Sequence, residues 1–377
     1  MSITPHDERF MAAAIRLSRQ HLGRTATNPS VGCLIVKDGA IVGRAVTALG
    51  GRPHAEPQAL AEAGELARGA TAYVTLEPCS HHGKTPPCAE ALIAYGVARV
   101  VISVTDPDPR VSGRGIAMLR DAGIEVDAGV LEAEGRHSLA AYLTRQTKNR
   151  PYVTLKLAVS ADGMIGRQGA GQVAITGPEA RAQVQALRAE TDAILVGIGT
   201  AISDDPLLTV RTPGLEAYSP VRIVLDPNLA LPLASKLVAT ARDVPVIVVA
   251  SEEISPLGSE ADGTPPTGLA DIQSRRTALE AAGVEIVYCN PYHPEVLLPA
   301  LATRGISSLL VEGGAKTARL FLDAGLVDRI QLYQAPLVIG EGGIESPLRA
   351  TDIPSGFAHR GTSLYGADRL DEYEREN

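Results

Sequence analysis

The sequence predicts two α/β domains in one chain. Its 377 residues are enough to bury two hydrophobic cores. Short apolar runs, typical of strands, alternate with segments whose apolar residues recur at helical spacing. The alternation is interrupted at Asn149-Arg150-Pro151, and a new apolar strand begins at Tyr152. We therefore expect one domain over residues 1–149 and a second over residues 150–377.

The composition disfavours a membrane span and a general nucleic-acid surface. No apolar run approaches the roughly 18 residues of a membrane helix, and the first residues show no signal peptide. The net charge of −8 disfavours a nucleic-acid partner. Four cysteines in a chain this long do not make a disulfide framework. Cys33 and Cys289 are interpreted as small buried hydrophobic residues, with a free reactive thiol as the lesser alternative. We expect a cytoplasmic protein.

The first domain is predicted to open with a helix. Thr4 is the expected N-cap, Pro5 lies in the first turn, and the helix ends near Gly23. Asp38-Gly39 is a strong hairpin signal. The remaining elements alternate, with strands at 31–36, 41–46, 73–76, 99–104 and 124–130, and helices at 54–68, from 88 onward, at 115–122 and at 131–148. This rhythm predicts helices packed on a mixed sheet.

The second domain is predicted to be a single α/β domain of seven strands. They are expected at 152–159, 193–198, 221–226, 244–250, 284–288, 307–311 and 328–334. Thr176 and Glu179 have the spacing of a capping box, with Pro178 opening a helix that runs to about residue 190. The segment from Ser255 to Thr267, rich in Gly, Pro and Ser, is interpreted as a surface excursion.

A pair of glycines in this domain has the position of a phosphate-binding turn. Gly313-Gly314 follows a strand that ends at Glu312 and precedes a helical stretch. The free N–H groups at a helix N-terminus attract phosphate. The turn is not the G-x-G-x-x-G fingerprint, which excludes a standard dinucleotide-binding fold. Such turns are also common for packing reasons, so the turn by itself does not identify a cofactor.

The strongest chemical signal lies in the first domain. His54, Cys79 and Cys88 can supply three zinc ligands and leave a fourth position for water. Glu56, two residues after His54, is free to take a proton from that water and hand it to a leaving group. H-x-E followed by Pro-Cys is typical of zinc nucleobase deaminases. The long interval between the two cysteines excludes the plain cytidine or tRNA-adenosine deaminase form.

The run HAEPQAL followed by TLEPCSHHGKTPPC resembles the deaminase half of the bifunctional riboflavin-biosynthesis deaminase/reductases. The resemblance implies a cytidine-deaminase-like three-layer α/β/α domain that holds Zn²⁺. It implies substrate contacts at Asn28, His81, Lys84 and Asp106. Lys84 could pair with a substrate phosphate. The family often has His where Thr47 stands and Asn where Asp108 stands, so these two positions depart from its pattern.

The segments TLKLAVSADGMIG, ITGPEAR, DAILVGIGTAISDDPLLTVR and LLVEGGAKTARLFLDAGLVD are similar to the reductase half of the same family. That half has a dihydrofolate-reductase-like α/β fold and uses NADPH, and family members are oligomeric, which implies a homodimer. Ala174 and Pro227 differ from some members. The implied NADPH-binding residues are Ala158, Ala174, Thr200, Asp204, Gly314, Ala315, Lys316, Thr317, Ala318, Arg319 and Leu320. The implied substrate-binding residues are Lys156, Gln172, Thr176, Arg188, Leu208, Arg211 and Glu312.

The resemblance implies two consecutive reactions on a small phosphoribosylaminopyrimidine. The first is hydrolytic deamination of the diaminopyrimidinone, with Glu56 moving the proton. The second is reduction of the ribosyl group to ribityl by NADPH, for which the sequence names no proton donor beyond a guess at Lys156. Three alternatives remain. They are a zinc deaminase of another nucleobase with a non-catalytic C-terminal domain, a zinc-stabilised scaffold, and a chain in which only one domain is active.

Overall fold

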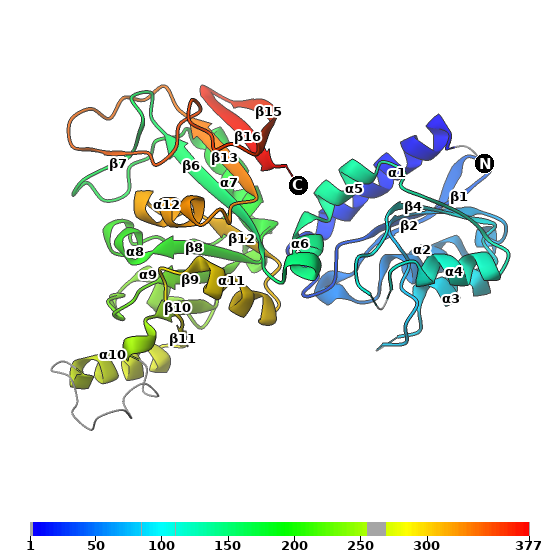
Figure 1. Ribbon diagram of the computed structural model, residues 1–377, viewed down its shortest axis with the longest axis horizontal. Coiled ribbons are helices and arrows are strands. Elements are labelled where there is room, and N and C mark those ends of the chain that lie inside the picture. Colours follow the sequence, from blue (N-terminus) through cyan, green and yellow to red (C-terminus); the bar gives the residue numbers. More distant parts are fainter. Residues whose placement is uncertain (1–2, 84, 110, 255–268, 377) are drawn as a thin grey trace. The chain divides into compact units, whose positions relative to one another are not determined.

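The computed structural model describes residues 3–83, 85–109, 111–254 and 269–376 (Figure 1). The predicted Ser255–Thr267 excursion and the predicted substrate-contact residue Lys84 lie outside the described residues. The chain divides into two compact units, residues 1–150 and residues 151–377. Within the described part of the chain, no helix is both long and apolar enough to cross a membrane.

The first unit is built on a five-stranded mixed sheet in the order β2-β1-β3-β4-β5. Its strands are β1 (Gly32–Lys37), β2 (Ala40–Val46), β3 (Thr71–Leu76), β4 (Arg99–Val104) and β5 (Glu125–Ala128). β1 is antiparallel to β2 and β3, and β3, β4 and β5 are parallel. The hairpin turns at Asp38 and Gly39, whose φ angles are 50° and 77°, as a two-residue turn with left-handed central residues requires.

Helices cover both faces of this sheet (Figure 1). α1 (Pro5–Ser18) and α5 (Glu132–Ser138) lie on one face, where Met11 packs with Leu34 and Val101. On the other face Leu60 and Leu119 pack with Ile102. The helices of that face are α2 (Ala55–Ala63), α3 (Cys88–Tyr95), α4 (Arg114–Asp121) and α6 (Ala140–Lys148). The predicted three-layer α/β/α arrangement is confirmed.

The prediction of one helix over 131–148 is wrong, because two helices meet at Leu139. Leu139 has φ −97° and ψ 8°, which ends α5 and starts α6. α5 packs on α1 and β4, whereas Leu139 and Leu143 are buried in the core of the opposite face. A single straight helix cannot cover both faces of a sheet, so the chain bends where it passes from one to the other.

The second unit is built on a nine-stranded sheet in the order β11-β10-β9-β8-β12-β6-β13-β16-β15. Neighbouring strands from β11 to β13 are parallel, and the last two pairings are antiparallel. The strands are β6 (Tyr152–Val159), β8 (Ala193–Gly197), β9 (Val221–Leu225), β10 (Val246–Ala250), β11 (Val284–Tyr288), β12 (Ser308–Val311), β13 (Arg329–Gln334), β15 (Phe357–Tyr365) and β16 (Asp368–Arg375). β7 (Met164–Arg167) and β14 (Gly343–Glu345) form a separate pair.

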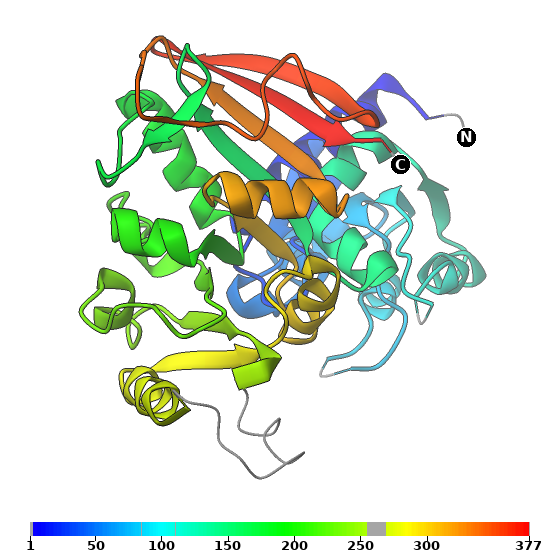
Figure 2. The same ribbon diagram turned by 60° about the vertical axis from the view of Figure 1, so that its left-hand side comes forward.

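Helices again cover both faces, and Figure 2 shows α12 lying across the front of the sheet. Phe321 of α12 packs with Leu155 and Leu309 on that face. Leu237 packs with Val224 and Val248 on the other face. The helices are α7 (Pro178–Ala189), α8 (Ile198–Asp204), α9 (Lys236–Ala239), α10 (Leu269–Ala281), α11 (Pro294–Thr303) and α12 (Ala315–Asp323).

α1 and α7 both begin where the sequence predicts a capped helix. Only α1 has the predicted cap. Thr4 caps α1: its hydroxyl accepts from the Asp7 N–H at 3.2 Å. α7 begins at Pro178 as predicted, yet its N-cap is Gly177 and no side chain caps it. The Gly177 N–H donates instead to the carboxylate of Asp368, at 2.6 Å, on the distant strand β16. A tertiary contact replaces the predicted capping box.

Candidate active sites

The three predicted zinc ligands lie together in the first unit. His54 is the N-cap of α2, Cys88 is the first residue of α3, and Cys79 follows β3. Their donor atoms all lie within 4.8 Å of one another. The His54 Nδ1 atom is 3.3 Å from the Cys88 sulfur and 3.8 Å from the Cys79 sulfur. Tetrahedral zinc with ordinary bond lengths separates nitrogen and sulfur ligands by about 3.6 Å. The residues therefore fit a zinc ion.

The hydrogen bonds of this cluster favour a thiolate. The side chain of Cys88 and its backbone N–H, 3.3 Å from the Cys79 sulfur, both hydrogen-bond to that sulfur and lower the pKa of Cys79 to about 4. The hydrogen bond to Cys79 also raises the pKa of His54, although burial opposes this. Thiolate sulfur is a good ligand for zinc. The lowered pKa favours the thiolate form of Cys79, whereas hydrogen bonding to Cys79 and burial raise the pKa of Cys88.

Glu56 lies beside the cluster in the first turn of α2. Its side chain is buried, with the residue 4% exposed. Burial raises the pKa of Glu56, and the charge of Cys79 raises it further. A carboxyl group with a raised pKa accepts a proton more readily than a free one, as a group that takes a proton from water must. The structure therefore supports the proton-transfer role that the sequence predicts for Glu56.

A cavity of about 290 Å³ joins Glu56 and two of the predicted zinc ligands to the predicted substrate contacts. Asn28, His81 and Asp106 line it together with Glu56, His54 and Cys79. Thr47 and Asp108, the two positions that depart from the family pattern, line the same cavity. Only Lys84 of the predicted deaminase residues is not placed, because it lies outside the described residues. The volume is suited to a substrate built on one pyrimidine ring.

Sequence reasoning missed two residues that shape this cavity. Tyr142 of α6 donates its hydroxyl to both carboxylate oxygens of Asp106, at 3.1 and 3.0 Å. Glu77 is buried and accepts four backbone N–H groups, from Asp106, Gly113, Gly115 and Ile116. Glu77 lies in the TLEPC segment. A carboxylate directly after an apolar strand could have marked it as a buried acceptor next to the zinc ligands. No pattern in the sequence marked Tyr142.

The second site is a charge cluster with little solvent exposure at the carboxyl end of β12. The Arg188 guanidinium donates to both carboxylate oxygens of Glu312, at 2.8 and 3.1 Å. The Lys156 amino group from β6 is 3.8 Å from the same carboxylate. Burial raises the pKa of Glu312, but Arg188 and Lys156 outweigh it and the net pKa is lowered. Burial lowers the pKa of Lys156. Arg211 adds further positive charge near Glu312.

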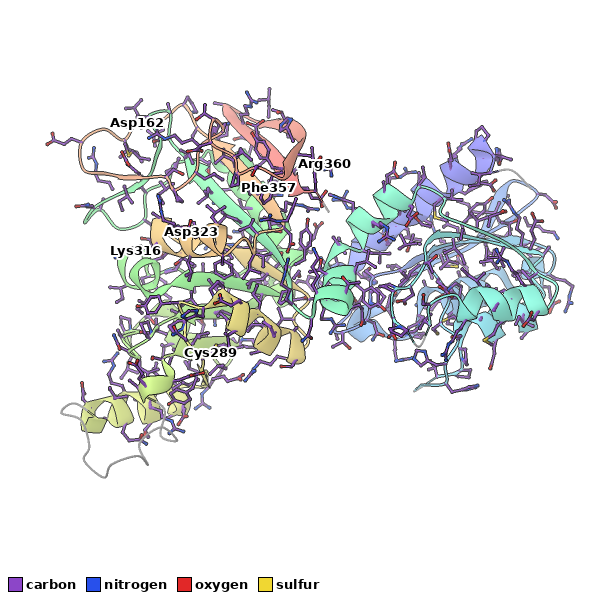
Figure 3. The ribbon with its side chains drawn as sticks, in the orientation of Figure 1. Asp162, Cys289, Lys316, Asp323, Phe357 and Arg360 are labelled. Carbon is purple, nitrogen blue, oxygen red and sulfur yellow. The ribbon has the colours of Figure 1, made fainter. Side chains whose placement is uncertain are left out.

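Glycines bring α8 and α12 close together next to this cluster. The Gly314 N–H donates to the hydroxyl of Thr200 on α8, at 3.1 Å. A Cβ atom at Gly313 would lie 2.6 Å from the Cβ of Thr317, and one at Gly197 would lie 2.5 Å from the Thr317 hydroxyl. No side chain caps α12, whose start is marked in Figure 3 by Lys316. Its first turn is therefore a place where phosphate fits, as NADPH requires.

Some of the predicted reductase residues do not lie at the charge cluster or at the start of α12. Gln172 and Ala174 are exposed on the segment before α7, which approaches α8 through Gly171, whose Cβ would lie 3.4 Å from the Ser203 carbonyl oxygen. The Ala318 side chain is buried in the hydrophobic core, and its N–H donates within α12. The other predicted residues lie on β6 (Ala158), before α7 (Thr176), at the end of α8 (Asp204), after α8 (Leu208) and on α12 (Ala315, Arg319, Leu320).

The fold and the two sites define a zinc deaminase joined to a reductase. The family model of the cytidine and deoxycytidylate deaminase zinc-binding region matches residues 4–104. The model of the RibD C-terminal domain matches residues 151–355.

Whole-chain relatives agree with these two matches. The riboflavin biosynthesis protein RibD of Aquifex aeolicus (strain VF5) is 41% identical over 336 residues, which cover 89% of this chain and 88% of that protein. RibD of Escherichia coli (strain K12) is 40% identical over 337 residues, 89% of each chain. A diaminohydroxyphosphoribosylaminopyrimidine deaminase/5-amino-6-(5-phosphoribosylamino)uracil reductase from Thermotoga maritima, known from its crystal structure, has a TM-score of 0.82 at 35% identity and covers 98% of this chain and 99% of its own.

The chain belongs to the RibD family of bifunctional riboflavin-biosynthesis deaminase/reductases. The predicted fold class, with a cytidine-deaminase-like first domain and a reductase second domain, is confirmed. The alternative of a zinc deaminase with a non-catalytic C-terminal domain is not supported, because the match to the RibD C-terminal domain spans residues 151–355.

Proposed function

We propose that this chain deaminates 2,5-diamino-6-(5-phosphoribosylamino)pyrimidin-4-one to 5-amino-6-(5-phosphoribosylamino)uracil and then reduces the ribosyl group of that product to ribityl. One observation carries the proposal: buried Glu56 shares a cavity with zinc-ligand donors. The second unit contributes its own buried cluster of Lys156, Arg188 and Glu312. We assign the deaminase to residues 1–149 and the reductase to residues 150–377.

In the deaminase, zinc when bound to His54, Cys79 and Cys88 lowers the pKa of water and makes it a nucleophile. Glu56 takes the proton of the attacking water and delivers it to the departing amino group, so that ammonia leaves. Asn28, His81 and Asp106, with Lys84, are proposed to orient the pyrimidine and its phosphoribosyl group. Tyr142 holds the Asp106 carboxylate in place through its hydroxyl.

In the reductase, NADPH supplies the hydride when bound. The proposed NADPH site is centred on the start of α12, because the N–H groups of a helix N-terminus attract phosphate. Gly313 and Gly314 let this turn pack closely against Thr317 and Thr200. Lys156, Arg188 and Glu312 are proposed to bind the sugar phosphate with Gln172, Thr176, Leu208 and Arg211. Lys156 is the one lysine among these residues, and its lowered pKa suits a group that gives up a proton. We propose it as the proton donor to the opening ribose.

A timed assay tests the proposal. Zinc-loaded protein receives the diaminopyrimidinone ribosyl phosphate, and NADPH is added only after a delay. Ammonia is expected before the addition and loss of NADPH absorbance after it. Ammonia without NADPH consumption would show an inactive second site. An absence of ammonia would remove the deaminase assignment and favour the scaffold alternative.

The quaternary state and cellular location are part of the proposal. We propose a homodimer in the cytoplasm, as the family resemblance implies. Light scattering of the purified protein is expected to give twice the 39.4 kDa chain mass. A monomer mass at micromolar concentration would contradict the dimer.

A further inference from the structure

Two arginines in the wall of the deaminase cavity have no assigned role. Arg52 and Arg145 both line it, and neither forms an ion pair with any carboxylate of the described residues. A guanidinium stays charged at neutral pH and has five N–H donors in a planar fork that matches phosphate oxygens. Such a group without a counter-charge in a partly buried wall is costly unless a ligand supplies the negative charge.

Arg145 reaches the cavity from α6. Its Nη2 atom donates to the backbone carbonyl of Thr27, at 2.5 Å, and Thr27 and Asn28 line the same cavity. Its Nε atom is buried and has no hydrogen-bond partner within the described ranges. One backbone carbonyl thus fixes the side chain in place while leaving its charge unneutralised.

Arg52 reaches the cavity from the segment before His54. Its Nη1 atom donates to the hydroxyl of Thr85, at 2.7 Å. A Cβ at Gly83 would lie 3.6 Å from its Nη2 atom, so the guanidinium lies along the loop between Cys79 and Cys88. Its partner is again neutral, and its charge is again left for a ligand.

Two acidic side chains in the wall, Glu77 and Asp106, accept hydrogen bonds from groups other than these arginines. Glu77 is saturated by backbone N–H groups, and the Asp106 carboxylate accepts from Tyr142 and from the Asp108 N–H at 2.9 Å. The neutral pyrimidine ring brings no charge to the cavity, so the phosphate monoester is the part of the substrate that complements two cations.

We infer that Arg52 and Arg145 form a phosphate clamp of the deaminase, which makes this site select the phosphorylated nucleotide over its dephosphorylated riboside. The inference rests on the proposed deaminase activity and extends it to a selectivity between two substrates. It also assigns a role to α6, whose residues no local motif connects with the zinc site.

The test compares the KM of ammonia release for the phosphorylated substrate and for its phosphatase-treated riboside. Arg52→Gln and Arg145→Gln are each expected to raise the KM for the phosphorylated substrate roughly tenfold to a hundredfold, the cost of one charged hydrogen-bonding partner. The KM for the riboside is expected to stay unchanged. Inorganic phosphate should compete with the phosphorylated substrate in the wild type and more weakly in both variants, and it should not compete with the riboside.

Two further variants serve as controls. Arg120→Gln on α4 loses a comparable bond, from Nη2 to the Val126 carbonyl at 3.1 Å, but Arg120 does not line the cavity. It should leave both KM values unchanged. Arg145→Lys keeps the charge and should keep part of the preference for the phosphorylated substrate. Thermal melting and zinc content show whether each variant is folded.

The outcomes separate this inference from the proposed function. The clamp is overturned if the wild type releases ammonia and the variants raise both KM values equally. It is also overturned if the variants raise neither KM value, because the arginines then have only a structural role. If the wild type releases no ammonia from either substrate, the proposed deaminase activity fails and the clamp fails with it. A rise confined to the phosphorylated substrate supports the clamp.

Discussion

Glu56 and Glu312 show how neighbouring groups decide what a buried glutamate does. Burial raises the pKa of Glu56, and the nearby Cys79 charge adds to the effect. Burial acts in the same direction on Glu312, but Arg188 and Lys156 lie against its carboxylate and the pKa falls. The raised pKa suits Glu56 to its proposed proton transfer, and the lowered pKa suits Glu312 to pairing with Arg188 and Lys156. Residue type alone does not distinguish these roles.

The ion pair of Asp7 and Arg99 is expected to govern the acid stability of the first unit. The Arg99 Nη1 atom is 2.7 Å from an Asp7 oxygen, and the Asp7 side chain is 2% exposed. Burial would raise the pKa of Asp7, but bonds from Arg99, Thr4 and Tyr73 outweigh it and lower the pKa. Asp7→Asn should destabilise the protein by about 3 kcal/mol at pH 7, since it leaves Arg99 short of a partner. Urea unfolding measures this.

The pH dependence follows from the lowered pKa of Asp7. A carboxyl whose folded pKa is depressed stabilises fully above its unfolded pKa of about 4, and this stability is lost as pH falls through the folded value. Between pH 5 and pH 2 the wild type should therefore lose more stability than Asp7→Asn. The exposed Asp121→Asn serves as control and should change stability by less than about 0.5 kcal/mol. Parallel pH curves for wild type and Asp7→Asn would contradict the account.

Individual site residues could be predicted from the sequence only where they belong to a local motif. His54, Glu56, Cys79 and Cys88 stand in short, chemically readable patterns. Arg145 and Tyr142 reach the same cavity from α6, more than fifty residues further along the chain. Their presence depends on how α6 packs, and nothing in the spacing of a helix says which of its polar residues will face a cavity.

At the scale of elements, Glu77 connects the start of α4 with the segment that carries the predicted zinc ligand Cys79. It accepts N–H groups from Gly113, Gly115 and Ile116, and a Cβ at Gly115 would lie 2.0 Å from the Pro78 carbonyl oxygen. Glu77→Ala should destabilise the protein by about 3 kcal/mol, because buried donors lose a charged acceptor. It should also weaken zinc binding roughly tenfold to a hundredfold, because Cys79 follows two residues later.

Competition for zinc with a chromophoric chelator measures the second effect. Glu65→Ala, at an exposed position, is the control and should bind zinc like the wild type. Unchanged zinc affinity in Glu77→Ala would show that the helix and the metal loop are not coupled.

The close packing of Gly313 against the first turn of α12 gives a prediction for the reductase. A Cβ at Gly313 would lie 2.6 Å from the Thr317 Cβ, so Gly313→Ala must displace the first turn of α12. The KM for NADPH should rise roughly tenfold, because a small displacement of a binding turn costs this much or more, while ammonia release stays unchanged. Gly361→Ala is a matched control, since nothing lies within 4 Å of its added Cβ. An unchanged KM in Gly313→Ala would contradict a phosphate-binding role for the turn.

Elements were predicted well where the hydrophobic pattern was continuous and missed where it was not. The seven parallel strands of the second unit have apolar, buried side chains. The hairpin of β15 and β16 was missed, because β15 is an edge strand whose side chains are mostly exposed. The break at Leu139 was missed because the helices before and after it cover opposite faces of the sheet. The local spacing of apolar residues does not show which face a helix covers.

For the whole molecule, the two units have separate cores. The clusters around Leu60 and Met11 contain only residues of the first unit, and those around Leu155 and Val224 contain only residues of the second. Independent cores predict two calorimetric unfolding transitions. A zinc chelator should lower only one of them. NADP⁺ at a hundred times its Kd should stabilise only the other, by about 2.7 kcal/mol. One transition moved by both ligands would contradict this.

The central claim is that one chain holds two chemically separate active sites, and reciprocal variants test it most directly. Glu56→Gln should keep its zinc and reduce the deaminated uracil substrate at the wild-type rate, while ammonia release falls at least about a hundredfold. Glu312→Gln should release ammonia at the wild-type rate and oxidise no NADPH. Loss of both activities in either variant, or ammonia release that survives in Glu56→Gln, would contradict the account.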